Sequence, residues 1–435
     1  MERKNFRQIF ATAIILTFSF SVFAQVRIGS PYSRYGVGDL SNINAPVFMS
    51  LGGSAIGMRS SSFVNPWNPA SYTAFDSTSF IFEGGVYSQS LALKTVNTSQ
   101  NSGYSSIGTL LFGFPVTQRL KASFGLMPYS SVGYNIGESS SLVVSSDSST
   151  RVKNVYAGDG GINKVYFGLG YQLSKNLSIG VNADFLFGTI NRNSTSNLLD
   201  DTYAMSYRQN TAIRVHDFSY NFGMQYTTKI GTDKRFTLGA VYTPAIDLKA
   251  NHDTLNALVS PTNSDLIFYT VNQSSDVKGK IHIPQAFGGG FSFEKEAKFL
   301  IAGDVYYQNW EKFKIFDQTD SLKNSLKASL GLQFIPNGND YNHYYKRIRF
   351  RMGLNYHQSY LQLNNQQIND FGVSFGLGLP LKKGQSELSS KSCVNLGVEF
   401  GRRGTTDFSL IKENYVRFTV SLSLYDSWFR KLKFY

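Results

Sequence analysis

The sequence contains very little cysteine and few charged residues. A single cysteine, Cys393, stands among 435 residues, so an internal disulfide is impossible. The five histidines are scattered without metal-ligand spacing, and there is no His-Glu-x-x-His sequence or phosphate-binding glycine loop ahead of a helical pattern. We therefore expect no enzyme activity and no cofactor or metal. Charged residues make up only 16%, which is low for a secreted soluble domain.

Long apolar runs are missing after the first residues of the chain. Residues 1–24 have the organisation of a secretory signal peptide, in which Arg3, Lys4 and Arg7 precede an apolar stretch at residues 9–22. That stretch is short for a helix crossing about 30 Å of hydrocarbon, which disfavours a helical membrane anchor. No cysteine follows the expected cleavage site, so a lipoprotein is not expected. Beyond it, no run approaches the roughly 20 apolar residues of a spanning helix.

Aromatic residues and glycine are abundant instead, with 35 Phe, 26 Tyr and 39 Gly. This composition is typical of transmembrane β-barrels, which carry aromatic girdles at both membrane interfaces. The formal net charge is +13. An exported protein is not expected to meet nucleic acid, so the positive charge indicates contact with anionic lipid head groups or a basic barrel lumen.

Strict alternation of apolar and polar residues begins near residue 77 and is clearest at 163–173 and 177–190, on either side of a three-residue turn. Period-two runs of about ten residues joined by short turns predict β-hairpins. The sequence predicts an all-β fold, a transmembrane antiparallel barrel of about fourteen strands. The predicted strands are 78–88, 106–115, 119–128, 163–173, 177–190, 212–227, 234–246, 280–293, 298–309, 325–335, 346–356, 370–380, 393–403 and 414–424.

The predicted connections alternate between short turns and longer loops, as in outer-membrane barrels with short periplasmic turns and long external loops. Because the number of predicted strands is even and the short turns are expected in the periplasm, the N-terminal segment and the C-terminus are both expected on the periplasmic side. We expect a hatch in the lumen at residues 25–76, the barrel at 77–425 and a periplasmic tail at 426–435. The basic tail, which carries Trp428, is expected to lie near lipid phosphates.

Residues 50–80 resemble the N-terminal segment of the FadL/TodX outer-membrane transporters. The resemblance rests on a glycine-rich stretch and an Asn-Pro-Ala sequence just before the first strand, and here the Asn-Pro element is doubled. The residues that carry it are Gly52, Gly53, Gly57, Asn65, Pro66, Asn68, Pro69 and Ala70. The general sequence character of two later blocks, residues 112–136 and 283–313, also resembles that of the family.

The resemblance implies a fourteen-stranded barrel, plugged by an N-terminal hatch, that admits long-chain fatty acids and similar molecules passively. It also implies a lateral gap at a kinked strand. In this sequence the candidate kink is Gly125 to Pro128 in the third strand, because proline cannot donate a ladder hydrogen bond. The alternative is that Pro128 simply ends the strand. Relatives of such barrels also serve as non-transporting subunits of secretion or assembly complexes.

Three arginines are predicted to form one inward stripe on the strand at 346–356. The inferred lumenal charge network consists of Arg347, Arg349 and Arg351 with the carboxylates Glu399, Asp184 and Asp304. Buried charges are normally paired, so a network bracing barrel and hatch is one interpretation. The other is a site for a carboxylate ligand, because an arginine fork matches carboxylate geometry.

The regions 129–162 and 247–279 are long, polar and serine-rich, and we interpret them as solvated surface loops. In the second region, Ile267, Phe268 and Tyr269 could contact an apolar ligand or anchor the loop.

The resulting expectation is a FadL-like barrel in the outer membrane that takes up hydrophobic or amphipathic molecules passively, in contact with anionic lipids. The alternative is a non-transporting accessory subunit of a secretion or barrel-assembly complex, with other subunits as partners.

Overall fold

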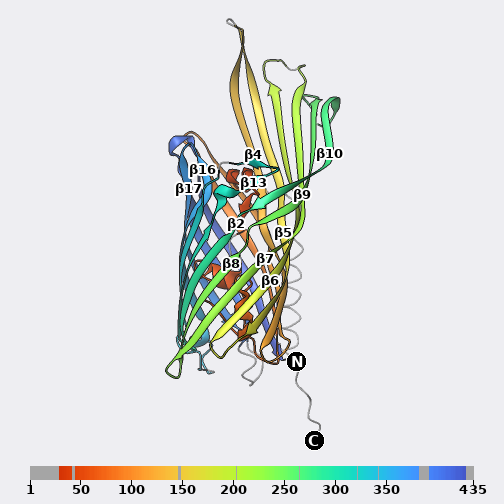
Figure 1. Cartoon of the computed structure of the whole chain (residues 1–435). Helices are drawn as coiled ribbons and strands as arrows, with labels where there is room; N and C mark the ends of the chain where they lie inside the picture. Colours follow the sequence, from red (N-terminus) through yellow and green to blue (C-terminus); the bar gives the residue numbers. More distant parts are fainter. Residues whose placement is uncertain are drawn as a thin grey trace, which may run out of the picture.

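The computed structural model describes residues 29–41, 45–145, 148–201, 203–263, 265–320, 322–340, 342–381 and 391–427. The predicted signal peptide and nearly all of the predicted tail, including Trp428, lie outside these residues. Fourteen strands form a closed antiparallel barrel, because the last strand pairs with the first along its whole length (Figure 1). The predicted fold class and strand number are confirmed.

The wall strands follow one another around the barrel, and two of them are each built from two pieces. They are β2 (Ser79–Lys94), β3 (Ser99–Pro115), β4 (Leu120–Ser145), β5 (Ser148–Gln172), β6 (Leu177–Leu198), β7 (Ser206–Ile230), β8 with β9 (Lys234–Thr243, Ile246–Val259), β10 with β11 (Ile267–Ile283, Ala286–Lys295), β12 (Phe299–Gln308), β15 (Ser325–Phe334), β16 (Arg349–Leu363), β17 (Gln366–Pro380), β18 (Cys393–Arg403) and β19 (Lys412–Ser427). The two divided strands are interrupted at Pro244 and Pro284, whose nitrogens cannot donate a ladder bond.

The outer face of the barrel is an apolar band. Every wall strand contributes large apolar side chains that remain exposed, for example Phe167 at 51% and Phe418 at 55%. Their neighbours along each strand point into the lumen and are buried, as in the alternation of β2. A closed wall with an apolar exterior is the arrangement that transmembrane β-barrels present to lipid.

The two ends of the barrel differ, and we call them the short-turn end and the long-hairpin end. At the long-hairpin end, β4 and β5 pair continuously as far as Ser145 and Ser148, and β9 and β10 pair from Ile246 and Ile283 outward. The prediction of surface loops at 129–162 and 247–279 was therefore wrong. These regions are serine-rich strands that extend beyond the apolar band, where ladder hydrogen bonds form without lipid-facing side chains.

In the described part of the chain, the helices are short, of three to six residues each. The helices are η1 (Pro31–Arg34), α2 (Pro46–Met49), η2 (Pro69–Ala74), η3 (Trp310–Lys312), η4 (Tyr344–Arg347) and η6 (Asp407–Ser409). Among the described residues, no helix is long and apolar enough to cross a membrane.

The described part of the N-terminal segment, residues 29–41 and 45–76, lies inside the barrel (Figure 1). Its backbone packs directly on lumen-facing glycines of the wall. A Cβ atom at Gly353 would lie 2.0 Å from the nitrogen of Gly52, and one at Gly239 would lie 2.1 Å from the carbonyl oxygen of Ile56. These distances are far below van der Waals contact, so glycine at these wall positions is what lets the segment approach.

Replacing Gly353 with valine is expected to displace the segment, because overpacking a filled interior costs about 1–3 kcal/mol. The measurement is tryptic cleavage after Arg59, whose guanidinium is held by Thr73 and Thr227 at 2.9 Å each. Cleavage should accelerate while the barrel stays folded on a heat-modifiability gel. Gly289→Val is the matched control, since a Cβ atom there meets nothing within 4 Å. Equal cleavage of both variants would contradict the packing argument.

Candidate functional site

The lumen contains a cavity of about 250 Å³ between the N-terminal segment and the wall. Leu40, Ile56 and Trp67 contribute from the segment, and Met127 and Tyr306 contribute from the wall. The lining also includes charged groups, namely Lys164, Asp184, Asp304 and Lys327. The site is therefore an amphipathic chamber in the middle of the barrel.

The wall ladder between β3 and β4 is broken next to this cavity. The two strands pair from Pro115 and Lys121 only as far as Leu110 and Leu126. β4 itself continues through Pro128 with a bulge before Ser130 and stays paired with β5. The alternative that Pro128 ends the strand is therefore wrong, although the proline stands two residues after Leu126, the last β4 residue paired with β3. Gly125 lies within the paired part, opposite Leu111.

The N-terminal segment occupies the free edge of β4 at this break. A two-residue strand, β1 (Asp39–Leu40), pairs antiparallel with Ser131 and Ser130. The amide of Ser41 donates to the carbonyl oxygen of Tyr129 at 2.9 Å. The segment thus supplies hydrogen bonds that β3 would supply in an unbroken wall.

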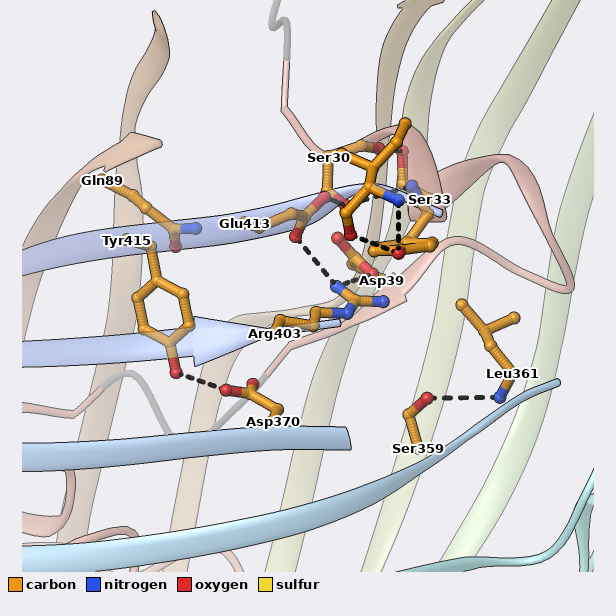
Figure 2. A network of polar contacts seen from close by, with 12 residues as sticks. Ser30, Ser33, Asp39, Gln89, Ser359, Leu361, Asp370, Arg403, Glu413 and Tyr415 are labelled. Atoms are coloured by element: carbon orange, nitrogen blue, oxygen red, sulfur yellow. Dashed lines mark hydrogen bonds and ion pairs between the residues drawn. The ribbon is translucent and has the colours of Figure 1, made fainter. Parts of the chain in front are cut away.

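A polar network fixes the segment to a second part of the wall, strands β18 and β19, as Figure 2 shows. Arg403 donates to Asp39 at 2.8 Å and lies 3.9 Å from Glu413. Ser30 donates through its hydroxyl to the same Glu413. The carboxylate of Glu413 is almost completely buried, so its partners must satisfy it. Sequence reasoning missed this network, since its members lie at opposite ends of the chain.

Tyr32 adds to the attachment of the segment. Its hydroxyl donates to the carbonyl oxygen of Ile411 at 2.5 Å, and the guanidinium carbon of Arg403 lies 5.0 Å from its ring centre. Burial, together with the nearby Glu413, raises the pKa of Tyr32 to about 12. The phenol therefore stays protonated and able to donate throughout the physiological pH range.

The other half of the lumen at this level is an apolar core. Trp310 stacks on Tyr360 with ring centres 4.6 Å apart, and both are buried. The hydroxyl of Tyr360 donates to the carbonyl oxygen of Gly38 at 2.6 Å. Inward side chains of β4 to β10, such as Ile190 and Leu248, complete the cluster. The described residues thus fill the lumen on the long-hairpin side of the cavity.

The doubled Asn-Pro element holds the segment in two ways. The side-chain amide of Asn65 donates within the segment, to Ala55 at 2.7 Å and Met58 at 2.9 Å. The amide of Asn68 donates to Ile56 at 2.8 Å and also to Met224 of the wall at 3.3 Å. Asn68 also caps η2 by accepting from Ala70. The first asparagine shapes the segment, and the second fastens it to the barrel.

The predicted charge network has different partners from those expected. Arg351 is buried but donates to Gln333 at 2.8 Å and Asn395 at 3.0 Å. Arg349 begins β16, and Arg347 belongs to the short helix η4 instead of the strand.

The three carboxylates are engaged elsewhere. Glu399 pairs with Arg417 at 2.8 Å, and Asp184 pairs with Lys164 at 3.3 Å. Asp304 shares a row with Ser329 and Asn355, four residues along β16 from Arg351. Four residues correspond to about 13 Å, which is too far for an ion pair.

Asp304 is one of the wall residues that hold the segment beside the cavity. One carboxylate oxygen accepts backbone N–H groups from Ala55 at 2.5 Å and Ile56 at 2.7 Å. Replacing it with leucine should leave both donors unsatisfied and cost about 1–3 kcal/mol for each.

Hydrogen exchange at Ala55 and Ile56 is expected to accelerate strongly in Asp304→Leu and only slightly in Asp304→Asn, which keeps an acceptor. If the two variants exchanged alike, the carboxylate would not be the fastening group.

A Gly-x-Ser-x-Gly sequence, the pattern of a nucleophile elbow, occurs near the end of the chain. Residues 372–376 read Gly-Val-Ser-Phe-Gly, but Ser374 lies within β17 and accepts from the amide of Gly52 at 3.1 Å. A nucleophile elbow requires a sharp strand-to-helix turn, which is not what surrounds Ser374. Among the described residues, no group of three or more His, Cys, Asp or Glu side chains could hold a metal ion.

Comparison with solved structures supports the fold. The toluene transporter TodX of Pseudomonas putida superposes with a TM-score of 0.57 at 16% identity, covering 90% of this chain and 100% of that chain. A FadL homologue of Pseudomonas aeruginosa gives a TM-score of 0.54 at 10% identity, covering 91% and 100%. The resemblance to FadL/TodX barrels is thereby confirmed at the level of fold.

Sequence comparisons give a family of a different name. Comparison with curated protein sequences gave no match. The model of the BamG family, however, matches residues 6–435, which is nearly the whole sequence. The chain therefore belongs to the BamG family.

Proposed function

We propose that this chain is a non-transporting accessory subunit of an outer-membrane complex, in which a filled barrel serves as a scaffold. The observation that carries the proposal is the attachment of residues 29–41 to two separate parts of the wall. Hydrogen bonds to β4 hold the segment at one place, and the partly buried pair of Arg403 with Asp39 holds it to β18 at the other.

Opening a path through this lumen would require breaking several contacts together. Separating Arg403 from its carboxylates alone would leave the buried Glu413 without its cation, at a cost of about 3–5 kcal/mol. The apolar cluster around Trp310 would also have to move. A structure fastened in this way favours a permanent filling over a plug that moves with each transport event.

Membership of the BamG family also favours the accessory role. In this proposal residues 1–24 are a signal peptide, and the N-terminal segment is a hatch that stays in place. The alternation of short turns and long hairpins supports an orientation with the short-turn end in the periplasm. The apolar band then lies in the outer membrane, with basic side chains near anionic lipid head groups.

Purification of the tagged full-length chain from native membranes in mild detergent tests the proposal. We expect one or more other outer-membrane proteins in fixed stoichiometry through size-exclusion chromatography. The control is a tagged unrelated barrel of the same membrane, expressed at the same level. Recovery of this chain alone, without partners, would contradict the accessory role.

A second candidate function is passive uptake of hydrophobic or amphipathic molecules, of the long-chain fatty acid type. The observation in its favour is the cavity beside the β3–β4 break, where Met127, Pro128 and Tyr129 line the chamber. Uptake of a labelled long-chain fatty acid by deletion and complemented cells tests it. Equal uptake by the two strains would exclude this function.

A further inference from the structure

Two neighbouring hairpins end in an exposed apolar surface far from the barrel body. The β6–β7 turn and the β9–β10 turn lie side by side, because Ser206 pairs with Val259, which in turn pairs with Ile267. We call the exposed side chains there the tip patch, and its members are Leu199, Tyr203, Met205, Leu266, Phe268 and Tyr269. Tyr203 is 93% exposed and Tyr269 is 63% exposed.

The size of the tip patch matches one side of a protein interface. Large side chains carry about 150–250 Å² each, so the exposed fractions of the six residues amount to roughly 700 Å². The largest apolar patch of an ordinary monomer is about 300–600 Å². One partner in a standard protein–protein interface buries about 800 Å². Exposed tyrosine and phenylalanine are also the residue types that anchor such interfaces.

The position of the tip patch excludes the membrane as its covering. On β7 the last large outward-facing apolar residue of the band is Phe218, followed by the polar His216 and Arg214. β7 then continues to Ser206, twelve residues beyond Phe218. At about 3.4 Å per residue and a tilt near 40°, that distance is about 30 Å above the band. Lipid head groups extend only about 5–8 Å beyond the hydrocarbon.

Charge around the tip patch is balanced by ion pairs. The two turns, residues 199–205 and 260–266, contain three aspartates and no lysine or arginine. Arg151 of β5 pairs with Asp200 at 2.7 Å, and Arg208 of β7 lies 3.6 Å from Asp265, whose side chain is 93% exposed. A partner with an apolar centre and a polar margin that carries both signs of charge would complement this surface.

We propose that the tip patch docks a folded protein domain lying outside the membrane on the long-hairpin side, with an apolar contact face and a polar rim of mixed charge. The inference rests on the proposed accessory function and names where one partner binds. Figure 1 shows the hairpins of β4 to β10 extending beyond the rest of the barrel, which gives such a domain access from above. A second copy in the same membrane would stand parallel and could reach the tip only from the side.

Cysteine labelling of the full-length protein tests the proposal. The single native cysteine is buried, so Cys393→Ser provides the background. Tyr203→Cys and Phe268→Cys report on the tip patch, and Asn97→Cys, exposed in the β2–β3 turn, is the control. The probe is a membrane-impermeant polyethylene glycol maleimide, applied to cells, to the complex in mild detergent and to the isolated barrel.

We expect labelling at positions 203 and 268 to be about tenfold slower in cells and in the complex than in the isolated barrel, as burial in a packed interface requires. Labelling at position 97 should be the same in all three. The double substitution Tyr203→Ser with Phe268→Ser should release a subunit from the complex. Val96→Ser, at a residue 73% exposed on another hairpin, should not.

Other outcomes would overturn the proposal in distinguishable ways. Fast labelling at position 203 in a complex that retains its partners would rule out the docking site but not the accessory function. Fast labelling together with the absence of any partner would rule out both the docking site and the accessory function. Protection in the isolated barrel with a doubled mass by light scattering assigns the patch to a second copy. Protection that appears only in phosphatidylethanolamine–phosphatidylglycerol vesicles assigns it to lipid.

Discussion

Replacing Arg403 with methionine is expected to detach residues 29–41 from the barrel wall and to lower the free energy of unfolding by about 3–5 kcal/mol. The side chain of Arg403 lies between Asp39 of the segment, at 2.8 Å, and Glu413 of β19, at 3.9 Å. Methionine fills similar space but cannot compensate either carboxylate. A buried carboxylate left without its cation costs far more than a surface pair gains.

Two observables separate this effect from general damage. Amide hydrogen exchange in residues 31–38 should accelerate, and the guanidinium midpoint of unfolding should fall. Arg402→Met is the matched control, because the neighbouring Arg402 is exposed on the other face of β18. Adding Asp39→Asn and Glu413→Gln to Arg403→Met should restore part of the loss, since it removes the uncompensated charges. No difference between the Arg402 and Arg403 variants would show that the pair does not hold the segment.

The wall of the barrel could be predicted from the sequence because lipid imposes a period of two. Outward residues such as Phe418 and Val420 must be apolar, so each membrane crossing leaves a readable pattern. The strands beyond the apolar band have solvent on their outer face and lose that constraint. Residues 129–145 and 148–162 therefore looked like loops, although they pair along nearly their whole length.

The lumenal site was predictable only in part, and for a related reason. Alternation identifies which side chains point inward, as it did for Arg351 and Asp304, both of which contact lumenal partners. Alternation does not give the position of a residue along the barrel axis relative to strands far away in the sequence. That position depends on the pairing register of the strands. In the observed register, Asp304 lies opposite the segment and away from Arg351.

The pair of Arg403 with Asp39 shows the same limit more strongly. The two residues are 364 positions apart and meet only because the barrel closes around the segment. The Asn-Pro element was recognisable, since asparagine side chains at helix caps and turns have local signatures. Its second function, the bond from Asn68 to Met224 in the wall, has no local signature.

A disulfide between residues 40 and 130 is expected to fix β1 permanently in the β3–β4 break. Leu40 and Ser130 are direct partners, and the bond from Ser41 to Tyr129 makes them a non-hydrogen-bonded pair. Such pairs have Cα atoms about 4.5 Å apart, within the range that a disulfide spans. In the Cys393→Ser background, Leu40→Cys with Ser130→Cys should oxidise readily. Closing a loop of about 90 residues stabilises by about 4.6 kcal/mol in the chain-entropy model.

The functional result of this disulfide distinguishes the two candidate functions. A scaffold does not need the segment to move, so recovery of partner subunits should be the same in oxidised and reduced protein. A channel would need the break cleared, so fatty acid uptake would fall on oxidation and return with dithiothreitol. Leu40→Cys with Ser131→Cys is the control, because successive strand residues face opposite sides and cannot bridge to the same partner. If oxidation reduced uptake while partner recovery stayed constant, the break would be a transport path and the claim that the subunit does not transport would have to be abandoned.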